Sequence, residues 1–219
     1  MAGEKKLPMR RCFTAIFLIR TSLDSIETCR NTKFRQNVPI TTLNFLVKPM
    51  TERMINKEEM CNHLKDLGIP FERVDHPAVF TCAESHLVPP LEGADTKNLF
   101  LRDNKGKRYF LVTVPHSKAV DCKALGRQIG AGPLSFGSPE RLREMLGVEP
   151  GSVTLLATIN DSEGRVKVYL DESFMLSNLI QCHPLENTAT LVIGREQLFK
   201  FLESNGHKPE IINVPSRET

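Results

Sequence analysis

The residues from 97 to 114 constrain the fold more than any other part of the sequence. They contain two strand-like stretches, Lys97–Arg102 (KNLFLR) and Tyr109–Val114 (YFLVTV), joined by Asp103–Lys107 (DNKGK). Aromatic and β-branched residues on either side of a short turn that contains glycine are typical of a β-hairpin. The sequence therefore predicts an antiparallel hairpin here, within a fold that contains a β-sheet.

Helix start signals lie on both sides of the hairpin. Asn56 can cap a helix whose apolar residues recur at helical spacing, and Asp121 and Ser138 can cap two more. A further helix is predicted over Glu196–Ser204, and a short helix is predicted to follow Asp171. At least four helices are therefore expected.

Strands are predicted between these helices. They are Phe71–Val74, Val153–Ile159, Val166–Leu170, Ala189–Ile193 and Ile211–Val214. The second and third of them flank the turn Asn160–Gly164, which predicts another hairpin. Thr81 and Glu84 form a T-x-x-E capping box that predicts one more short helix. This order of helices and strands predicts an α/β fold of the mixed α+β kind.

The first 49 residues differ in composition from the rest. Residues 1–49 carry nine Lys and Arg against three Asp and Glu, a charge of +6, whereas residues 50–219 carry 20 against 23, a charge of −3. We interpret residues 1–49 as a poorly structured basic extension and residues 50–219 as one domain. A targeting segment, or a start of translation at Met50 or Met54, are other interpretations of the extension. Because the domain is not globally basic, any contact with nucleic acid must use a local patch.

The spacing of cysteine and histidine argues against metal and disulfide chemistry. The six cysteines contain no C-x-x-C pair, and the six histidines contain no H-x-x-x-H pair. We expect reduced thiols in a cytoplasmic protein, and neither a metal nor another cofactor. The longest apolar run, Cys12–Ile19, is far shorter than the about 20 residues of a membrane helix, so no membrane partner is expected.

Several colinear segments of the domain match the pattern of a known family. They are Gly93–Val112 (GADTKNLFLRDNKGKRYFLV), Glu149–Phe174 (EPGSVTLLATINDSEGRVKVYLDESF) and Gln181–Ile193 (QCHPLENTATLVI), supported by His76–Glu84 (HPAVFTCAE) and Leu134–Leu142 (LSFGSPERL). In this order and spacing they resemble the YbaK and prolyl-tRNA synthetase editing-domain family over residues 52–214. The resemblance implies a mixed sheet flanked by helices, no metal, and a pocket for the aminoacyl-adenosine end of tRNA.

The finer resemblance is to the free-standing, alanine-specific branch of this family, the ProXp-ala type. It implies a hydrolase: an aminoacyl-tRNA deacylase that removes alanine wrongly attached to proline tRNA. The implied partners are the acceptor end of that tRNA and prolyl-tRNA synthetase. Leu155, Gln181 and Cys182 depart from the family pattern and leave open a cysteine-specific deacylase of the YbaK type. The alternative from a different class is a non-catalytic module that binds tRNA or a synthetase.

The resemblance places three residues at catalytic positions. Lys97 stands at the family's central lysine, Gly151 at the glycine of its G-x-x-x-P loop, and His183 at the histidine of its H-P-L-x-N-T-A-T segment. We expect the Lys97 ammonium to act electrostatically on a phosphate or on the ester carbonyl. Backbone N–H groups of the loop Gly151–Val153 would stabilise the negative charge that develops on the carbonyl oxygen. Water is the expected nucleophile.

Residues near these positions are expected to bind the substrate. The set comprises Asn98, Ser152, Asp171, Asn187 and Thr188. Two interpretations of Asp171 are open: its carboxylate attracts the ammonium group of the amino acid, or it caps the following helix. Asn187 and Thr188 either bind substrate or open a turn. Cys182 beside His183 suggests a cysteine nucleophile, but neighbours on an extended segment point apart, which argues against one.

Basic residues cluster on the hairpin that carries Lys97. They are Arg102, Lys105, Lys107 and Arg108. One interpretation is a patch beside the site that binds phosphates of the tRNA acceptor stem. The other is a charged turn that protects the edge of a sheet. Because tryptophan is absent, we expect little stacking on bases.

Overall fold

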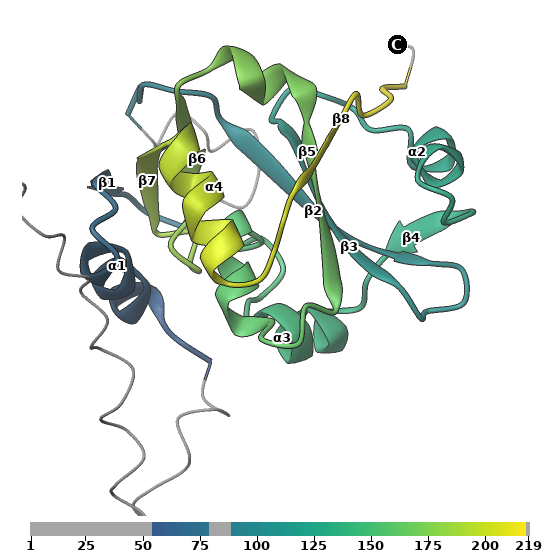
Figure 1. Cartoon of the computed structure of the whole chain (residues 1–219), viewed down its shortest axis with the longest axis horizontal. Helices are drawn as coiled ribbons and strands as arrows, with labels where there is room; N and C mark the ends of the chain where they lie inside the picture. Colours follow the sequence, from purple (N-terminus) through teal and green to yellow (C-terminus); the bar gives the residue numbers. More distant parts are fainter. Residues whose placement is uncertain (1–53, 79–88, 218–219) are drawn as a thin grey trace, which may run out of the picture. The chain divides into compact units, whose positions relative to one another are not determined.

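The structure is a computed structural model, and it describes residues 54–78 and 89–217. In this part of the chain the strands form two sheets, and helices pack against them (Figure 1). The helices are α1 (Lys57–Asp66), α2 (Cys122–Gln128), α3 (Pro139–Leu146), α4 (Arg195–Ser204) and two 3₁₀ helices, η3 (Leu155–Asn160) and η4 (Glu172–Leu176). The strands are β1 (Phe71–Asp75), β2 (Thr96–Asp103), β3 (Tyr109–Pro115), β4 (Leu134–Phe136), β5 (Val166–Asp171), β6 (Leu179–Cys182), β7 (Ala189–Gly194) and β8 (Glu210–Ile212). Over the described ranges, no helix has the length and apolar character needed to cross a membrane.

The larger sheet is mixed and has five strands in the order β4-β2-β3-β5-β8. The predicted hairpin is confirmed as β2 and β3, which pair antiparallel with Lys97 opposite Val114. β5 pairs parallel to β3, and β8 pairs parallel to β5. The predicted mixed α/β class is therefore confirmed.

The smaller sheet is antiparallel and has the order β1-β7-β6. Its strand β6 lies beside the segment that leads into β2, because Ala94 N donates to Leu179 O and Gln181 N donates to Ala94 O, both at 2.9 Å. The Thr96 hydroxyl adds a bond of 2.8 Å to Gln181 O. These bonds join the two sheets at the start of β2.

The predicted helix caps are confirmed. Asn56 and Glu59 form a capping box at the start of α1, and Asp121 accepts from two N–H groups at the start of α2. Ser138 caps α3, whose first residue is Pro139 and whose C-cap, Gly147, has a φ of 65°. A left-handed C-cap of this kind favours glycine, because a side chain there meets steric strain.

Side chains of the hairpin alternate between two apolar clusters. Leu101, Val112 and Val114 pack on one face of the sheet in a small cluster, which also contains Val214. Leu111 packs on the other face, in a larger cluster with residues from α1, α3 and α4. The sheet is thus covered on both faces.

One predicted strand is wrong. The segment predicted as the strand Val153–Ile159 is mostly buried and forms the 3₁₀ helix η3. Its N-cap is Thr154, whose hydroxyl accepts from Leu156 N at 3.4 Å. A short, continuous apolar run does not distinguish a strand from a buried helical turn. The predicted hairpin around Asn160–Gly164 is therefore absent, and β5 pairs with β3 instead. The short strands β4 and β6 were not predicted.

Other predictions fall on residues that the structure does not describe. These are the capping box of Thr81 and Glu84, the apolar run Cys12–Ile19, and the extension 1–49 with its boundary to the domain.

Replacing Leu111 by alanine tests the packing of the larger cluster. Leu111 is fully buried in β3, so Leu111→Ala should lower the free energy of unfolding by about 3 kcal/mol. Leu176→Ala is the control, because Leu176 is 92% exposed and should change the stability by less than about 0.5 kcal/mol. Urea unfolding followed by circular dichroism measures both. Equal effects of the two variants would contradict this assignment of the core.

Candidate functional site

Lys97 lies near the start of β2, at the edge of the sheet where β3 and β5 end. Its Nζ donates to the main-chain carbonyl of Lys118 at 2.6 Å. Lys118 belongs to the turn after β3, and its own N–H donates to Pro115 O at 2.9 Å. An ammonium group has three donors, so this bond orients Lys97 and leaves two donors for a ligand.

Asp171 is buried at the end of β5 and binds the neighbouring turn. Its Oδ2 accepts from Lys118 Nζ at 2.6 Å and from Val214 N at 3.1 Å, and its Oδ1 accepts from the N–H and hydroxyl of Ser173. Burial alone would raise the pKa of Asp171, but the Lys118 ammonium and the other hydrogen bonds outweigh it and lower that pKa. Asp171 is also the N-cap of η4. Of the two interpretations of Asp171, the structure confirms the cap, and contact with a substrate stays a prediction.

Asn98 projects from the opposite face of β2, as alternation along a strand requires. Its Oδ1 accepts from the Thr113 hydroxyl at 2.7 Å, and its Nδ2 lies 3.4 Å from the Thr96 hydroxyl. The Thr96 hydroxyl in turn binds β6 through Gln181 O. Asn98 is thus linked through the Thr96 hydroxyl to β6. Lys97, in contrast, is linked through Lys118 to Asp171.

His183 follows β6 and is held in one tautomer. Its Nδ1 lies 3.0 Å from Ala189 O, and a carbonyl only accepts, so Nδ1 carries the proton and Nε2 is an acceptor. Burial lowers the pKa of His183, and nearby His76, whose ring centre is 6.3 Å away, lowers it further. At neutral pH the ring is therefore an uncharged acceptor in the segment that follows β6.

Asn187 and Thr188 lie in the turn between β6 and β7. Asn187 is buried, and the Thr188 hydroxyl accepts from Lys57 Nζ at 2.8 Å. Lys57 also pairs with Glu186 at 3.4 Å. The sequence reasoning missed Lys57 because the first residue of a helix gives no signal that it will reach a turn 131 positions away. It also missed Lys118, because a residue in a turn gives no signal that it will bind a carboxylate 53 positions away.

One N–H group in the loop at Gly151 has a role that differs from the predicted one. Gly151 adopts a φ of 91°, which favours glycine. The next N–H, that of Ser152, donates to Glu149 O at 2.9 Å and closes a turn. Because that donor is already engaged, the prediction that the Ser152 N–H stabilises the developing negative charge is corrected.

Departures from the family pattern also have a local explanation. The side-chain amide of Gln181 lies within 3.3 Å of the carbonyls of Leu91, Glu92 and Gly93, so it binds the segment that leads into β2. Cys182 is buried, and burial raises its pKa to about 12. A thiol that stays protonated does not attack an ester, so the cysteine-nucleophile interpretation is rejected.

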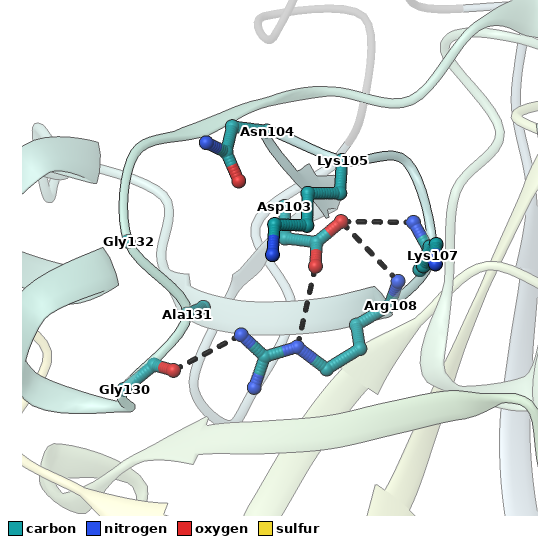
Figure 2. Close-up of a pocket in the computed structure, with 8 residues that line it drawn as sticks. All are labelled: Asp103, Asn104, Lys105, Lys107, Arg108, Gly130, Ala131 and Gly132. Atoms are coloured by element: carbon teal, nitrogen blue, oxygen red, sulfur yellow. Dashed lines mark hydrogen bonds and ion pairs between the residues drawn. The ribbon is translucent and has the colours of Figure 1, made fainter.

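The basic turn between β2 and β3 borders a hollow of about 400 Å³ (Figure 2). Buried Asp103 accepts from the N–H groups of Lys107 and Arg108 and from the Arg108 side chain, which also reaches Gly130 O. Hydrogen bonds from the Lys107 and Arg108 backbone lower the pKa of Asp103, which is therefore ionised and offsets the charge of Arg108. Lys105 and Lys107 are exposed at the turn, and Arg108, though paired with Asp103, keeps about half of its side chain exposed (52%).

One interpretation of these basic residues placed them beside Lys97, and the structure shows that they do not lie there. Lys97 and Asp103 stand near opposite ends of β2. With a rise of about 3.4 Å per residue, they are about 20 Å apart along the strand. The turn is therefore a separate surface of the same hairpin.

The described residues contain no group of three or more His, Cys, Asp or Glu side chains arranged to hold a metal ion. Cys61, Cys122 and Cys182 are free thiols in this part of the chain.

The fold resembles that of a solved protein structure. A solved structure described as a candidate trans-editing enzyme for prolyl-tRNA synthetase aligns with 75% of this chain and 100% of its own length, with a TM-score of 0.55 and 21% identity. At that identity the likeness shows the fold alone.

Sequence comparison identifies the family. A model of the aminoacyl-tRNA editing domain matches residues 76–201, and the chain belongs to this family. "Prolyl-tRNA synthetase associated domain-containing protein 1" of Mus musculus is 38% identical over 72% of this chain and 95% of its own length. "Prolyl-tRNA editing protein ProX" of Acetoanaerobium sticklandii is 33% identical over 72% of this chain and 97% of its own length. The family resemblance found in the sequence is confirmed.

Replacing His183 by asparagine tests its environment. Because the folded protein lowers the pKa of His183 below 6.5, the unfolded chain binds more protons below that pH. The wild type should therefore lose stability relative to His183→Asn, which does not titrate, as the pH falls from 7.5 to 5. Urea unfolding of both proteins at each pH measures this difference. A difference that stays constant with pH would show that His183 is not held neutral by the fold.

Proposed function

We propose that the protein is a trans-acting deacylase that hydrolyses the ester of alanine wrongly attached to proline tRNA. Membership of the aminoacyl-tRNA editing family and the prolyl-tRNA names of the relatives support this proposal. The observation that carries it is the arrangement at the start of β2. There an oriented ammonium, Lys97, stands at one end of a strand that also contacts β6, and the neutral His183 follows β6.

The chemistry needs little from the protein beyond charge and position. Water attacks the ester carbonyl, and negative charge develops on the carbonyl oxygen. The two remaining donors of Lys97 supply stabilisation to that oxygen or to the terminal phosphate, an effect often of about 3 kcal/mol for one donor. The Nε2 acceptor of His183 would receive a hydrogen bond from a ribose hydroxyl or from the attacking water.

The basic turn fits contact with the stem of the tRNA. Lys105 and Lys107 are exposed about 20 Å along the hairpin from Lys97, so they would bind phosphates several base pairs from the reacting end. Association with prolyl-tRNA synthetase is part of this proposal, on the strength of the relatives' names. We also propose that the protein acts in the cytoplasm, where free thiols such as Cys61 and Cys122 persist.

Deacylation assays with the full chain test the proposal. Alanyl-, cysteinyl- and prolyl-tRNA(Pro) are compared as substrates, and only the alanyl ester should be lost rapidly. Lys97→Ala should lower kcat about 100- to 1,000-fold, because it removes a preorganised donor. Lys200→Ala replaces an exposed lysine on α4 and is the control that should retain activity. Preference for the cysteinyl ester would assign the protein to the cysteine-specific branch, and tRNA binding without turnover would favour the non-catalytic module.

Charge reversal at the turn tests the proposed contact with tRNA. Lys105→Glu combined with Lys107→Glu should raise KM several-fold and leave kcat nearly unchanged, since neither residue is near Lys97. The slope of log affinity against log salt should become shallower by about one for each lysine that no longer binds a phosphate. Lys200→Glu is the matched control on another surface. An unchanged KM and salt slope would favour the alternative, a charged turn that protects the sheet edge.

A further inference from the structure

A partly buried ion pair stands directly behind the bond that orients Lys97. Lys97 Nζ donates to the carbonyl of Lys118, and Lys118 Nζ donates to Asp171 Oδ2, each at 2.6 Å. The Asp171 side chain is 1% exposed and that of Lys118 is 21% exposed. The same residue, Lys118, therefore binds Lys97 with its main chain and Asp171 with its side chain.

The turn that carries Lys118 is also held by the C-terminal segment. Asp121 N donates to Pro215 O at 2.9 Å, and Arg217 N donates to Ala119 O at 2.8 Å. Val214 N completes the link by donating to Asp171 Oδ2. The turn is thus fixed on one side by the buried carboxylate and on the other by residues 214–217.

Stability alone gives little reason for this arrangement. A buried ion pair seldom stabilises a fold more than apolar residues of similar size would, because both charges lose their hydration. Position gives a better reason, since a displacement of about 1 Å in a reacting group can cost about 100-fold in rate. A carbonyl held from two sides keeps a long, flexible lysine side chain in one place.

We propose that Asp171 and Lys118 are positioning residues that hold the Lys97 ammonium in place through the Lys118 carbonyl, with the C-terminal segment 214–217 as a clamp. This inference rests on the proposed function, in which Lys97 stabilises charge on the substrate. Neither Asp171 nor the Lys118 ammonium contacts the substrate in this scheme.

A double-mutant cycle in the full chain tests the proposal. Asp171→Asn keeps the acceptor oxygen for Ser173 or Val214 but removes the charge, and it should lower kcat for alanyl-tRNA(Pro) about 10- to 100-fold with KM changed less than about 2-fold. In the Lys97→Ala background, the same substitution should lower kcat less than about 2-fold, because nothing remains to be positioned. Lys118→Met, which keeps the volume of the side chain, should behave in the same way.

Asp161→Asn is the matched control. Asp161 is a buried carboxylate at the other end of β5, where it accepts from the N–H groups of Arg165 and Val166. Removing the charge of Asp161 should lower kcat by the same small factor with and without Lys97. If Asp171→Asn also lowers kcat by equal factors in both backgrounds, or if Lys118→Met leaves kcat unchanged, the positioning role is overturned.

A second measurement separates this inference from the proposed function. The side-chain NMR signals of Lys97 are assigned by their loss in Lys97→Ala, and hydrogen exchange of its ammonium is followed. Asp171→Asn should shift these signals and speed the exchange, whereas Asp161→Asn should not. If the wild type hydrolyses none of the esters, the proposed function fails, and this readout still decides the positioning: a shifted Lys97 signal supports it, and an unchanged one overturns it.

Discussion

Parallel pairing in the five-stranded sheet brings the site together. β5 runs parallel to β3, and β8 runs parallel to β5, so the carboxyl ends of all three strands meet at one edge. β2 runs antiparallel to β3 and therefore begins at that same edge. Lys97, Lys118, Asp171 and Val214 stand at the start of β2 or at the ends of the other strands, and this is why they meet although the chain separates them widely. Ligands of α/β sheets commonly bind at this edge.

Each buried carboxylate in this sheet stabilises a turn by accepting several hydrogen bonds. Asp171 joins the end of β5 to the turn after β3, and Asp103 closes the basic turn between β2 and β3. Asp161 does the same at the start of β5. Because an unpaired buried charge is costly, these acids are accompanied by Lys118, Arg108 and Arg165. At the basic turn the ion pair with Asp103 offsets the charge of Arg108, whose side chain stays about half exposed, so Lys105 and Lys107 contribute most of the net positive charge there.

Local signals in the sequence predicted the local structure well. The hairpin and the caps at Asn56, Asp121 and Ser138 depend on residues within a few positions, and they are confirmed. The segment Val153–Ile159 was predicted wrongly, because a continuous apolar run does not distinguish a strand from a buried helical turn. The role of Asp171 depends on Lys118, 53 positions away, and on Val214, 43 positions away. No spacing rule links such residues, so a carboxylate that positions a turn has the same sequence signal as one that binds a substrate.

Strand alternation also limits how a substrate can lie on this edge. Lys97 and Asn98 are consecutive and project from opposite faces of β2, so a ligand confined to one face contacts only one of them. Both side chains are within reach only of a ligand that crosses the start of the strand, where Thr96 joins β2 to β6 and His183 follows. Under the proposed function, a compact ester on the end of an extended polyanion would fit this shape, with its reacting group across the edge and its phosphates along the hairpin toward Lys105 and Lys107. In that arrangement the length of β2 would set the spacing between the reacting end and the phosphate contacts, so a longer or shorter hairpin should alter the register of the tRNA without disturbing Lys97.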